Sequence, residues 1–318
     1  MPRLAIVIQA LGSIESLEAT LVSVLENRPA DCEVLVALNG SYSDPYDLKG
    51  EVRFVEAGSR ISLTECTNRA LADSRTPFVH VLASGCRVTE GWTERALQRF
   101  GDRQVGSVVP LVVDSNDVEH IVAAGLGYHA SGRRYCVGGG QTQLSTEAIA
   151  EIIGPTGLAA FYRKSTFEQV GGLSRHLGSA QAAADLALAM ARSGFTTVLE
   201  SQSRVLAGQP SDEDTAPFQR ALYDERLFWR NLAGPGRVQT IASHAGLVAW
   251  EVVRSFPRPR TISQLAARLL ACCQMPMVAS RRPADHSELQ SVTGKWRIDG
   301  PHSGAKLGES SRTAIPSR

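Results

Sequence analysis

The first part of this chain repeats one pattern, in which a short apolar run is followed by a stretch with helical periodicity. The apolar runs have the length and composition of buried strands. They are Leu4–Ile8, Glu33–Leu38, Val52–Val55, Phe78–Leu82 and Val105–Val113. Strands that alternate with helices need crossover connections. The sequence therefore predicts an α/β fold, with a mainly parallel sheet, helices on both of its faces and ligands at the carboxyl ends of the strands.

Local signals mark where some of the helices begin. Apolar residues recur with a 3.6-residue period from Ile14 to Leu25, which predicts a helix between the first two strands. Ser62 and Glu65 are spaced to satisfy each other's free backbone N–H groups at a second helix start, and Ser165 and Glu168 repeat this spacing. Both pairs predict N-caps.

After about Asp212 the pattern changes to three helical segments without strands between them. We expect an α/β domain over residues 1–210, a helical extension over 211–280 and a disordered tail over 281–318. The tail is predicted to be disordered because it is rich in Arg, Ser, Gly and Pro and has too few apolar residues to offset its ordering entropy.

The three helical segments carry apolar stripes, for which there are two interpretations. The stripes can pack on each other and on the main domain. Alternatively they form an interfacial membrane anchor, because Arg254, Arg258, Arg260 and Arg268 lie beside the apolar faces. The stripes are Phe218, Ala221, Leu222, Phe228, Trp229 and Leu232; Val238, Ile241, Ala242, Ala245, Ala249, Val252, Val253 and Phe256; and Ile262, Leu265, Ala266, Leu269, Leu270 and Cys273.

The charge balance and the start of the chain limit its partners and location. Lys and Arg number 33 and Asp and Glu 32, so no global field attracts the protein to nucleic acid or to an anionic membrane. The apolar run at Leu4–Ile8 is too short for a signal peptide, and no stretch approaches the roughly 18 apolar residues that span a bilayer. We expect a cytoplasmic protein without a nucleic-acid partner, with peripheral contact to the inner face of a membrane as the alternative.

Several motifs then follow one another in an order typical of one enzyme family. Asn39-Gly40-Ser41 follows a strand, Asn68 lies in Cys66–Ala70, and Gly171–Leu173 precedes the segment Asp185–Phe195. Over residues 4–207 they resemble the Asp-Asn-Gly-Ser, Ala-Arg-Asn, Gly-Gly-Phe-Asp and Asp-Leu-x-Leu-Arg motifs of family 2 glycosyltransferases, rhamnosyltransferase-like members in particular. The resemblance implies a nucleotide-sugar transferase A-type fold and a nucleotide bound by Asn39, Gly40, Ser41 and Asn68. It also implies Mg²⁺ or Mn²⁺ as cofactor and a glycan or lipid acceptor.

The residues that the family uses for chemistry are missing from the matching positions. Inverting sugar transfer needs oxygen ligands for a divalent cation and a carboxylate that accepts the acceptor's proton. The Asp-x-Asp place holds Ala83, Ser84 and Gly85, the place of the metal-proximal His holds Ala207, and the place of the uracil-facing acid holds Leu38. Alanines of the segment Gln181–Ala184 stand where the base is expected. We therefore find no metal ligands, and the cofactor is left unknown.

A transferase that works without metal is the alternative. Arg87, Arg163 or Lys164 could neutralise the diphosphate or contact the acceptor, and Asp185, Asp114 or Asp117 could act as base. Each of these has a plainer interpretation: Asp185 as an acid at a helix start, Arg163 and Lys164 as surface charges, and Asn39-Gly40 as an ordinary turn.

The sequence leaves three functional hypotheses open. The chain is an active glycosyltransferase, a catalytically silent pseudo-glycosyltransferase that still binds a sugar or nucleotide, or a scaffold whose helical extension contacts a protein partner.

Overall fold

A computed structural model of the chain describes residues 2–56, 58, 61–129, 131–208, 216–232, 236–256 and 258–278. The tail expected to be disordered, 281–318, lies outside the described residues, as does the expected domain boundary near residue 210. The division into residues 1–210, 211–280 and 281–318 therefore stays a prediction.

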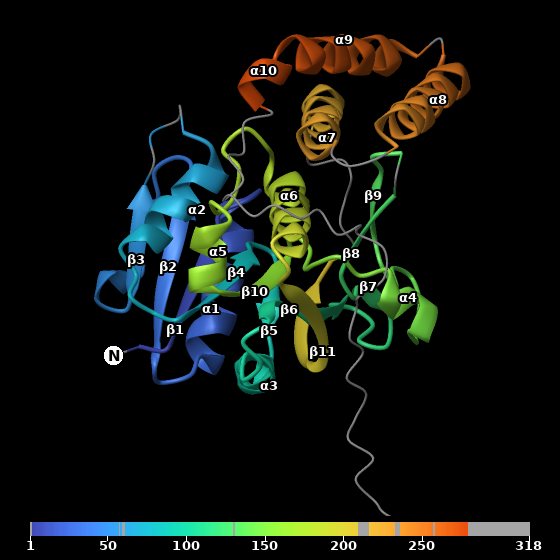
Figure 1. The fold of residues 1–318 in the computed structure, drawn as a ribbon. Coiled ribbons are helices and arrows are strands. Elements are labelled where there is room, and N and C mark those ends of the chain that lie inside the picture. Colours follow the sequence, from blue (N-terminus) through green and yellow to red (C-terminus); the bar gives the residue numbers. More distant parts are fainter. Residues whose placement is uncertain are drawn as a thin grey trace, which may run out of the picture.

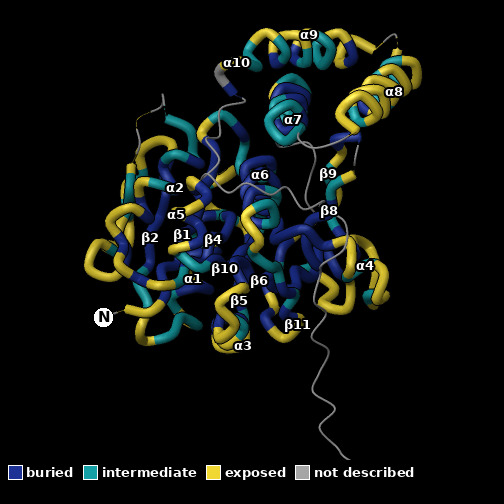
Figure 2. The backbone as a smooth tube through the Cα atoms, in the orientation of Figure 1, coloured by how far each residue is buried: buried dark blue, intermediate teal, exposed yellow. Residues whose placement is uncertain are grey.

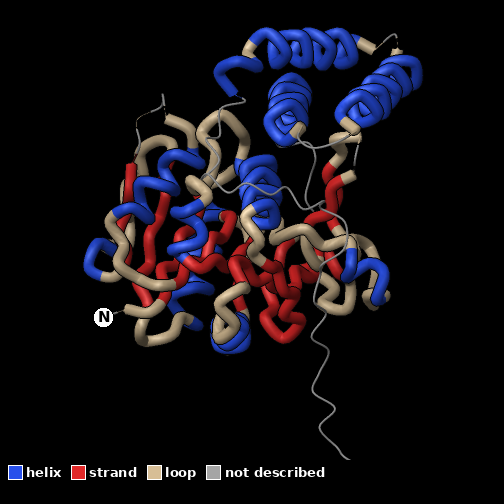
Figure 3. Tube along the Cα trace, in the orientation of Figure 1, coloured by secondary structure: helices blue, strands red, loops and turns tan. Residues whose placement is uncertain are grey.

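One sheet forms the centre of the molecule (Figures 1 and 3). In the described part of the chain its strands run in the order β3-β2-β1-β4-β10-β6-β11-β5, with β7 beside β6. β1 to β4 are parallel, β6 is parallel to β11, and β10 and β5 run antiparallel to their neighbours. The bounds are β1 (Leu4–Gln9), β2 (Cys32–Leu38), β3 (Val52–Glu56), β4 (Phe78–Ala83), β5 (Arg87–Val88), β6 (Val105–Asp114), β7 (Ile121–Ala123), β10 (Ala159–Arg163) and β11 (Thr196–Ala207).

The predicted strands and the first helices are confirmed. All the predicted apolar runs are strands of the sheet, and Ile14 begins helix α1 (Ile14–Asn27). Ser62 caps helix α2 (Leu63–Ala72), where its side chain accepts from the Glu65 N–H at 3.3 Å. The second predicted cap is wrong, because α5 (Lys164–Gln169) begins one residue before Ser165 and has no side-chain cap.

Helices cover both faces of the sheet, as the alternation predicts. Alternate residues of β1 enter different cores: Ile6 packs with α1 and α3 (Trp92–Arg99), and Val7 packs with α2, α5 and α6 (Ser179–Arg192). Figure 2 shows the buried strands between these helical layers. A small lobe completes the domain, made of the hairpin β8 (Leu126–Tyr128) and β9 (Arg134–Cys136) and helix α4 (Thr146–Ala150). The 3₁₀ turn Leu48–Gly50 lies apart from this lobe, next to β3.

The C-terminal helices form the predicted extension, and buried charges connect them. They are α7 (Pro217–Asn231), α8 (Arg237–Ser255), α9 (Pro259–Cys273) and the short α10 (Met275–Val278). Glu225 of α7 lies 3.1 Å from both His244 of α8 and Arg268 of α9, and Arg268 also reaches Glu251 of α8 at 2.7 Å. Arg268, one of the four arginines expected to face a membrane, is thus paired inside the helical extension.

The three apolar stripes differ in how far they are buried. That of α7 is partly buried, because Ala221, Leu222 and Phe228 are at most 9% exposed. α9 packs on α7 through Ala267 and Ala271. The predicted stripes of α8 and α9 instead turn to solvent, so the expectation that they pack on each other and on the domain is wrong for these two helices. No helix among the described residues has both the length and the hydropathy of a membrane span.

Candidate functional site

The carboxyl ends of β1, β2, β4, β6 and β11 lie at one edge of the sheet, which we call the carboxyl edge. Their directions follow from the pairing, because β10 is antiparallel to both β4 and β6 and therefore makes these two strands parallel. The strand order reverses at β1, because β2 and β3 lie on one side of β1 and β4 lies on the other. Open α/β sheets bind ligands at such a reversal point. The last residues of these strands are Gln9, Leu38, Ala83, Asp114 and Ala207.

Hydrogen bonds join the loops after β1 and β4 at this reversal point. The Ser84 N–H donates to the Gln9 carbonyl at 2.9 Å. The Ser84 hydroxyl accepts from the Leu11 N–H at 2.8 Å and donates to the Leu11 carbonyl. The one side chain that could offer oxygen at the Asp-x-Asp place is thus committed to holding two loops together.

Gly85 fixes the same segment to helix α1. Its N–H donates to the Ser16 carbonyl at 3.1 Å and to the Thr20 hydroxyl at 2.9 Å. Its φ is +88°, a conformation that residues with a Cβ rarely adopt. The segment Ala83–Gly85 is therefore held in place by backbone geometry and has no charged group that could hold a cation.

The turn after β2 presents polar groups at the carboxyl edge. Leu38, at the place of the uracil-facing acid, is buried, and Asn39, Gly40 and Ser41 are exposed. Within the part of the chain that the structure describes, the side chains of Asn39 and Ser41 have no hydrogen-bond partner. These groups are available to a ligand's hydroxyl or base edge.

Arg87 brings a positive charge to the other end of the carboxyl edge. In β5 it pairs with Leu206, and Leu206 pairs with Val113 of β6. Ala207 and Asp114, the last residues of β11 and β6, form the next pair in this register. Arg87 is exposed and has no ion-pair partner among the described residues.

Arg163 and Lys164 do not lie at the carboxyl edge. Arg163 pairs with Phe78, the first residue of β4, so it is about 16 Å from Ala83 at about 3.3 Å per residue. Its guanidinium donates to the carbonyls of Phe100 and Val105 and lies over the Phe100 ring. Lys164 donates to the Ser74 carbonyl and pairs with Glu168. Their predicted phosphate or acceptor role is corrected, because the antiparallel direction of β10 takes both to the opposite edge.

Asp185 is fully buried and engaged in an ion pair. Its carboxylate accepts from Arg230 Nε of α7 at 3.0 Å and from Asn231 Nδ2 at 2.9 Å. It lies in the second turn of α6, which begins at Ser179, so the interpretation as an acid at a helix start is also wrong. No local signal in the sequence points to Arg230, because this partner comes from a distant helix. Asp185 positions α7 and is not exposed to a substrate.

Asn68 connects α2 to the turn at Gly171–Leu173. Its amide group donates to the Leu173 carbonyl at 2.7 Å and accepts from the Leu173 N–H at 3.0 Å. A Cβ on Gly172, which has a φ of +65°, would lie 2.8 Å from the Asn68 oxygen. Both ends of the Asn68 side chain are therefore used within the protein, which does not favour the nucleotide contact that we expected.

We expect Asn68→Ala to lower the free energy of unfolding by about 1–3 kcal/mol, because it leaves two backbone groups of Leu173 without their partner. Asn68→Asp keeps the acceptor but places a second acceptor oxygen against the Leu173 carbonyl, so its loss should be at least as large. Urea denaturation measures both variants. An unchanged stability in Asn68→Ala, together with weaker nucleotide binding, would restore the ligand role of this residue.

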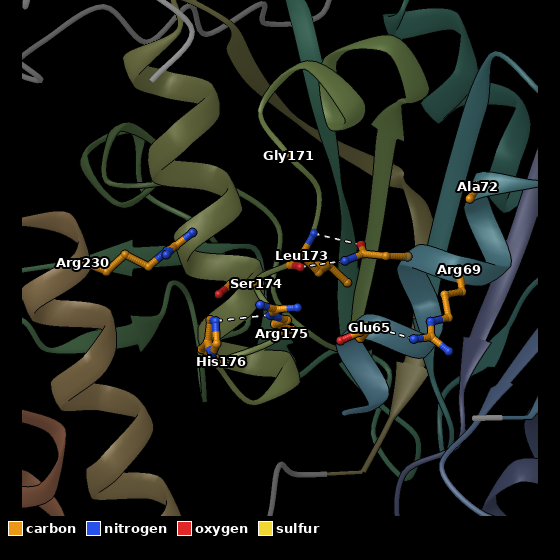
Figure 4. A pocket seen from close by; sticks show the side chains of 10 residues that line it. Glu65, Arg69, Ala72, Gly171, Leu173, Ser174, Arg175, His176 and Arg230 are labelled. Atoms are coloured by element: carbon orange, nitrogen blue, oxygen red, sulfur yellow. Dashed lines mark hydrogen bonds and ion pairs between the residues drawn. The ribbon is translucent and has the colours of Figure 1, made fainter. Parts of the chain in front are cut away.

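A positively charged pocket of about 550 Å³ lies between α2, the turn after α5 and α7 (Figure 4). Burial and the charges of Arg175, Arg226 and Arg230 lower the pKa of His176. None of the last strand residues at the carboxyl edge lines this pocket, whereas Asn68, one of the residues expected to bind the nucleotide, does. Its lining residues are Glu65, Asn68, Arg69, Ala72, Gly171, Leu173, Ser174, Arg175, His176 and Arg230.

Known protein families and curated proteins give no sequence match to this chain. Solved structures do share its architecture. The mannosyltransferase PcManGT from Pyrobaculum calidifontis, in complex with GDP-Man and Mn²⁺, matches with a TM-score of 0.55 and 16% identity over 86% of this chain and 87% of that chain. S. aureus TarS, residues 1–349, matches with a TM-score of 0.56 and 12% identity over 86% and 80% of the two chains. The chain therefore has the expected nucleotide-sugar transferase A-type fold.

Proposed function

We propose that this protein binds a nucleoside-diphosphate sugar at the carboxyl edge of its sheet. The fold supports this proposal, since a mannosyltransferase with the same architecture is solved with GDP-Man and Mn²⁺. The reversal of strand order between β1 and β4 provides the crevice where such sheets bind ligands. The exposed Asn39, Gly40 and Ser41 offer hydrogen bonds to the nucleoside. The resemblance to rhamnosyltransferase-like members and a glycan or lipid acceptor stay predictions.

The residues at the Asp-x-Asp place do not fit a divalent cation. Mg²⁺ and Mn²⁺ prefer carboxylate and other hard oxygen ligands. Ala83 and Gly85 have no side-chain oxygen, and the hydroxyl of Ser84 is hydrogen-bonded to Leu11. Among the described residues no three His, Cys, Asp or Glu side chains come together in a way that could hold a metal ion. A divalent cation therefore has no set of side-chain ligands at this place among the described residues.

Arg87 is the group that can take over the neutralisation of the diphosphate. This is the single observation that carries the proposal: an exposed arginine without an ion-pair partner among the described residues lies in register with the last residues of β11 and β6. A guanidinium forms paired, charge-assisted hydrogen bonds with phosphate oxygens. Unlike a metal ion, the guanidinium is part of the chain and needs no carboxylate ligands to hold it in place.

Transfer of the sugar is the weaker part of the enzyme hypothesis. The positions before Asp185 hold Ala182–Ala184, and Asp185 itself is buried against Arg230. Asp114 accepts from the Asn116 N–H and Asp117 from the Glu119 N–H and pairs with His120, so both already have local partners. Loss of general-base assistance alone lowers a rate by about 10²–10⁴. Binding with little or no turnover is the function that we propose.

We expect Arg87→Ala to weaken nucleotide-sugar binding by about tenfold or more, because a hydrogen bond to a charged group is worth about 1.5–3 kcal/mol. Calorimetry with a panel of UDP-, GDP- and dTDP-sugars measures this, in buffer with EDTA and in buffer with Mn²⁺. Affinity should be the same in both buffers. Arg95→Ala, at an exposed arginine of α3, is the matched control and should bind normally.

Other outcomes decide between the hypotheses. Binding that EDTA abolishes would mean that a cation site forms despite the residues at Ala83–Gly85. Rapid release of nucleoside diphosphate with an added acceptor would establish an active transferase. Failure of the whole donor panel to bind would overturn the proposal.

A further inference from the structure

The outer helices of the extension expose an unusual share of the protein's large apolar side chains. Of the 14 large hydrophobic residues that are exposed in the described part of the chain, 8 lie on α8, its C-cap and α9. Figure 2 shows exposed stretches along both helices, and Figure 1 places α9 beyond α7 from the sheet. We call this set the α8–α9 apolar face: Val238, Ile241, Trp250, Val253, Phe256, Ile262, Leu269 and Leu270.

The rotation of α8 that exposes its stripe is set by specific contacts. His244 is the buried residue of this helix, and its ring stacks on Phe228 with centroids 3.7 Å apart. Its Nδ1 donates to the Ser131 carbonyl at 2.7 Å, and its Nε2 lies 3.1 Å from Glu225. Turning the apolar stripe inward would break all of these contacts. The contacts of His244 therefore keep this apolar face exposed to solvent.

The charge around this face is strongly positive. From Arg237 to Cys273 the chain has five arginines and one acid, Glu251, whereas the whole chain has a net charge of only +1. Glu251 is paired with Arg268. The exposed arginines Arg254, Arg258 and Arg260, at the junction of α8 and α9, have no ion-pair partner among the described residues.

This charge argues against two possible occupants of the face. The segment 281–318 has seven basic and four acidic residues, so it has the same sign as the face and few apolar side chains to cover it. A second copy of the chain would bring the same arginines against each other. An anionic surface has the complementary charge.

We propose that the α8–α9 apolar face binds the surface of a bilayer containing anionic phospholipids. An amphipathic helix binds in this way when its Trp, Phe and Leu side chains enter the headgroup boundary and its arginines meet lipid phosphates. Each basic residue near an anionic leaflet adds to this attraction. The proposal is independent of nucleotide binding, because the face shares no residue with the carboxyl edge.

Sedimentation of the full chain with vesicles tests the proposal. We expect at least about tenfold stronger binding to vesicles of phosphatidylcholine mixed with phosphatidylglycerol than to phosphatidylcholine alone, and weaker binding at high salt. The indole fluorescence of Trp250, which is 62% exposed, should shift to the blue on binding. Trp250→Phe should remove most of this shift and leave much of the sedimentation.

Paired substitutions distinguish binding through the α8–α9 apolar face from nonspecific adsorption to the vesicles. Val253→Asp with Phe256→Asp should abolish the sedimentation without unfolding the chain, since both side chains are more than two thirds exposed. Val22→Asp with Val118→Asp, at exposed valines elsewhere, should bind like the native chain. Full chain that stays in the supernatant, or a Val253→Asp/Phe256→Asp variant that still sediments, overturns the proposal. So does a lipid-free dimer that this variant dissociates.

Discussion

Asp185→Ala is expected to lower the free energy of unfolding by about 3–5 kcal/mol, the usual effect of removing one partner from a buried ion pair. The substitution leaves the Arg230 guanidinium, whose side chain is only 8% exposed, without its carboxylate. It also removes one of the two acceptors of the Asn231 side-chain NH₂ group, which keeps its hydrogen bond to the Leu227 carbonyl. Since both of these residues belong to α7, the loss should loosen the attachment of the helical extension. Urea denaturation followed by circular dichroism measures the effect.

Two further variants test the cause. Asp185→Ala combined with Arg230→Met should recover much of the lost stability, because the buried guanidinium that is hydrogen-bonded to Asp185 is removed together with it. Asp117→Ala, at an acid whose side chain is 54% exposed, is the control and should change stability by less than about 0.5 kcal/mol. If Asp185→Ala folds with native stability but abolishes a measurable sugar transfer, Asp185 is the base after all and the structural role is wrong.

Acid is expected to destabilise the native protein through His80 by up to about 1.4 kcal/mol per pH unit. His80 is completely buried in β4, stacked on Phe161 with centroids 3.9 Å apart. Burial lowers its pKa to about 3, and the hydrogen bond to the Ala160 carbonyl opposes this only in part. The unfolded chain takes up the proton near pH 6.5, whereas the native chain does not. The neutral ring therefore contributes stability above about pH 6.5, and this contribution is lost as the pH falls towards about 3.

Comparison of pH slopes isolates this residue from the acidic groups that titrate in the same range. His80→Phe keeps an aromatic ring against Phe161 and should show a shallower loss of stability between about pH 6.5 and pH 4 than the native chain. Phe161→Leu keeps His80, so it should lower stability at every pH without changing the slope. Parallel curves for the native chain and His80→Phe would contradict the prediction.

The sheet and its helices could be predicted because their signals are local. Leu4–Ile8 and Phe78–Leu82 are apolar runs that are buried on both faces of a parallel sheet, and this burial shows directly in the sequence. The Ser62 cap is also local, since its partner is three residues away. Ser165 has the same spacing to Glu168 without the cap, because β10 leads directly into α5 at Lys164.

The candidate site was predicted less well, because its geometry depends on strand direction. The sequence alone does not distinguish Arg163 from Arg87 as a candidate phosphate contact. One ends an antiparallel strand at the far edge, and the other pairs with Leu206 at the carboxyl edge. Asn68 and Asp185 are polar residues within motifs, and this is the only reason why the sequence predicts a site role for them. Their partners, Leu173 and Arg230, are 105 and 45 residues away, and nothing local points to them.

By itself the sequence determined the order of strands and helices and the loss of carboxylates at Ala83–Gly85, because periodicity and residue identity are properties of neighbouring positions. Only the tertiary structure decided which charged side chains are paired inside the protein and which arginine lies at the carboxyl edge. It also decided that the stripes of α8 and α9 face solvent. Those outcomes depend on contacts between distant segments. A buried carboxylate needs a partner, which the fold can supply from a distant segment. His244 is the buried residue of α8, and its contacts determine which side of the helix faces solvent.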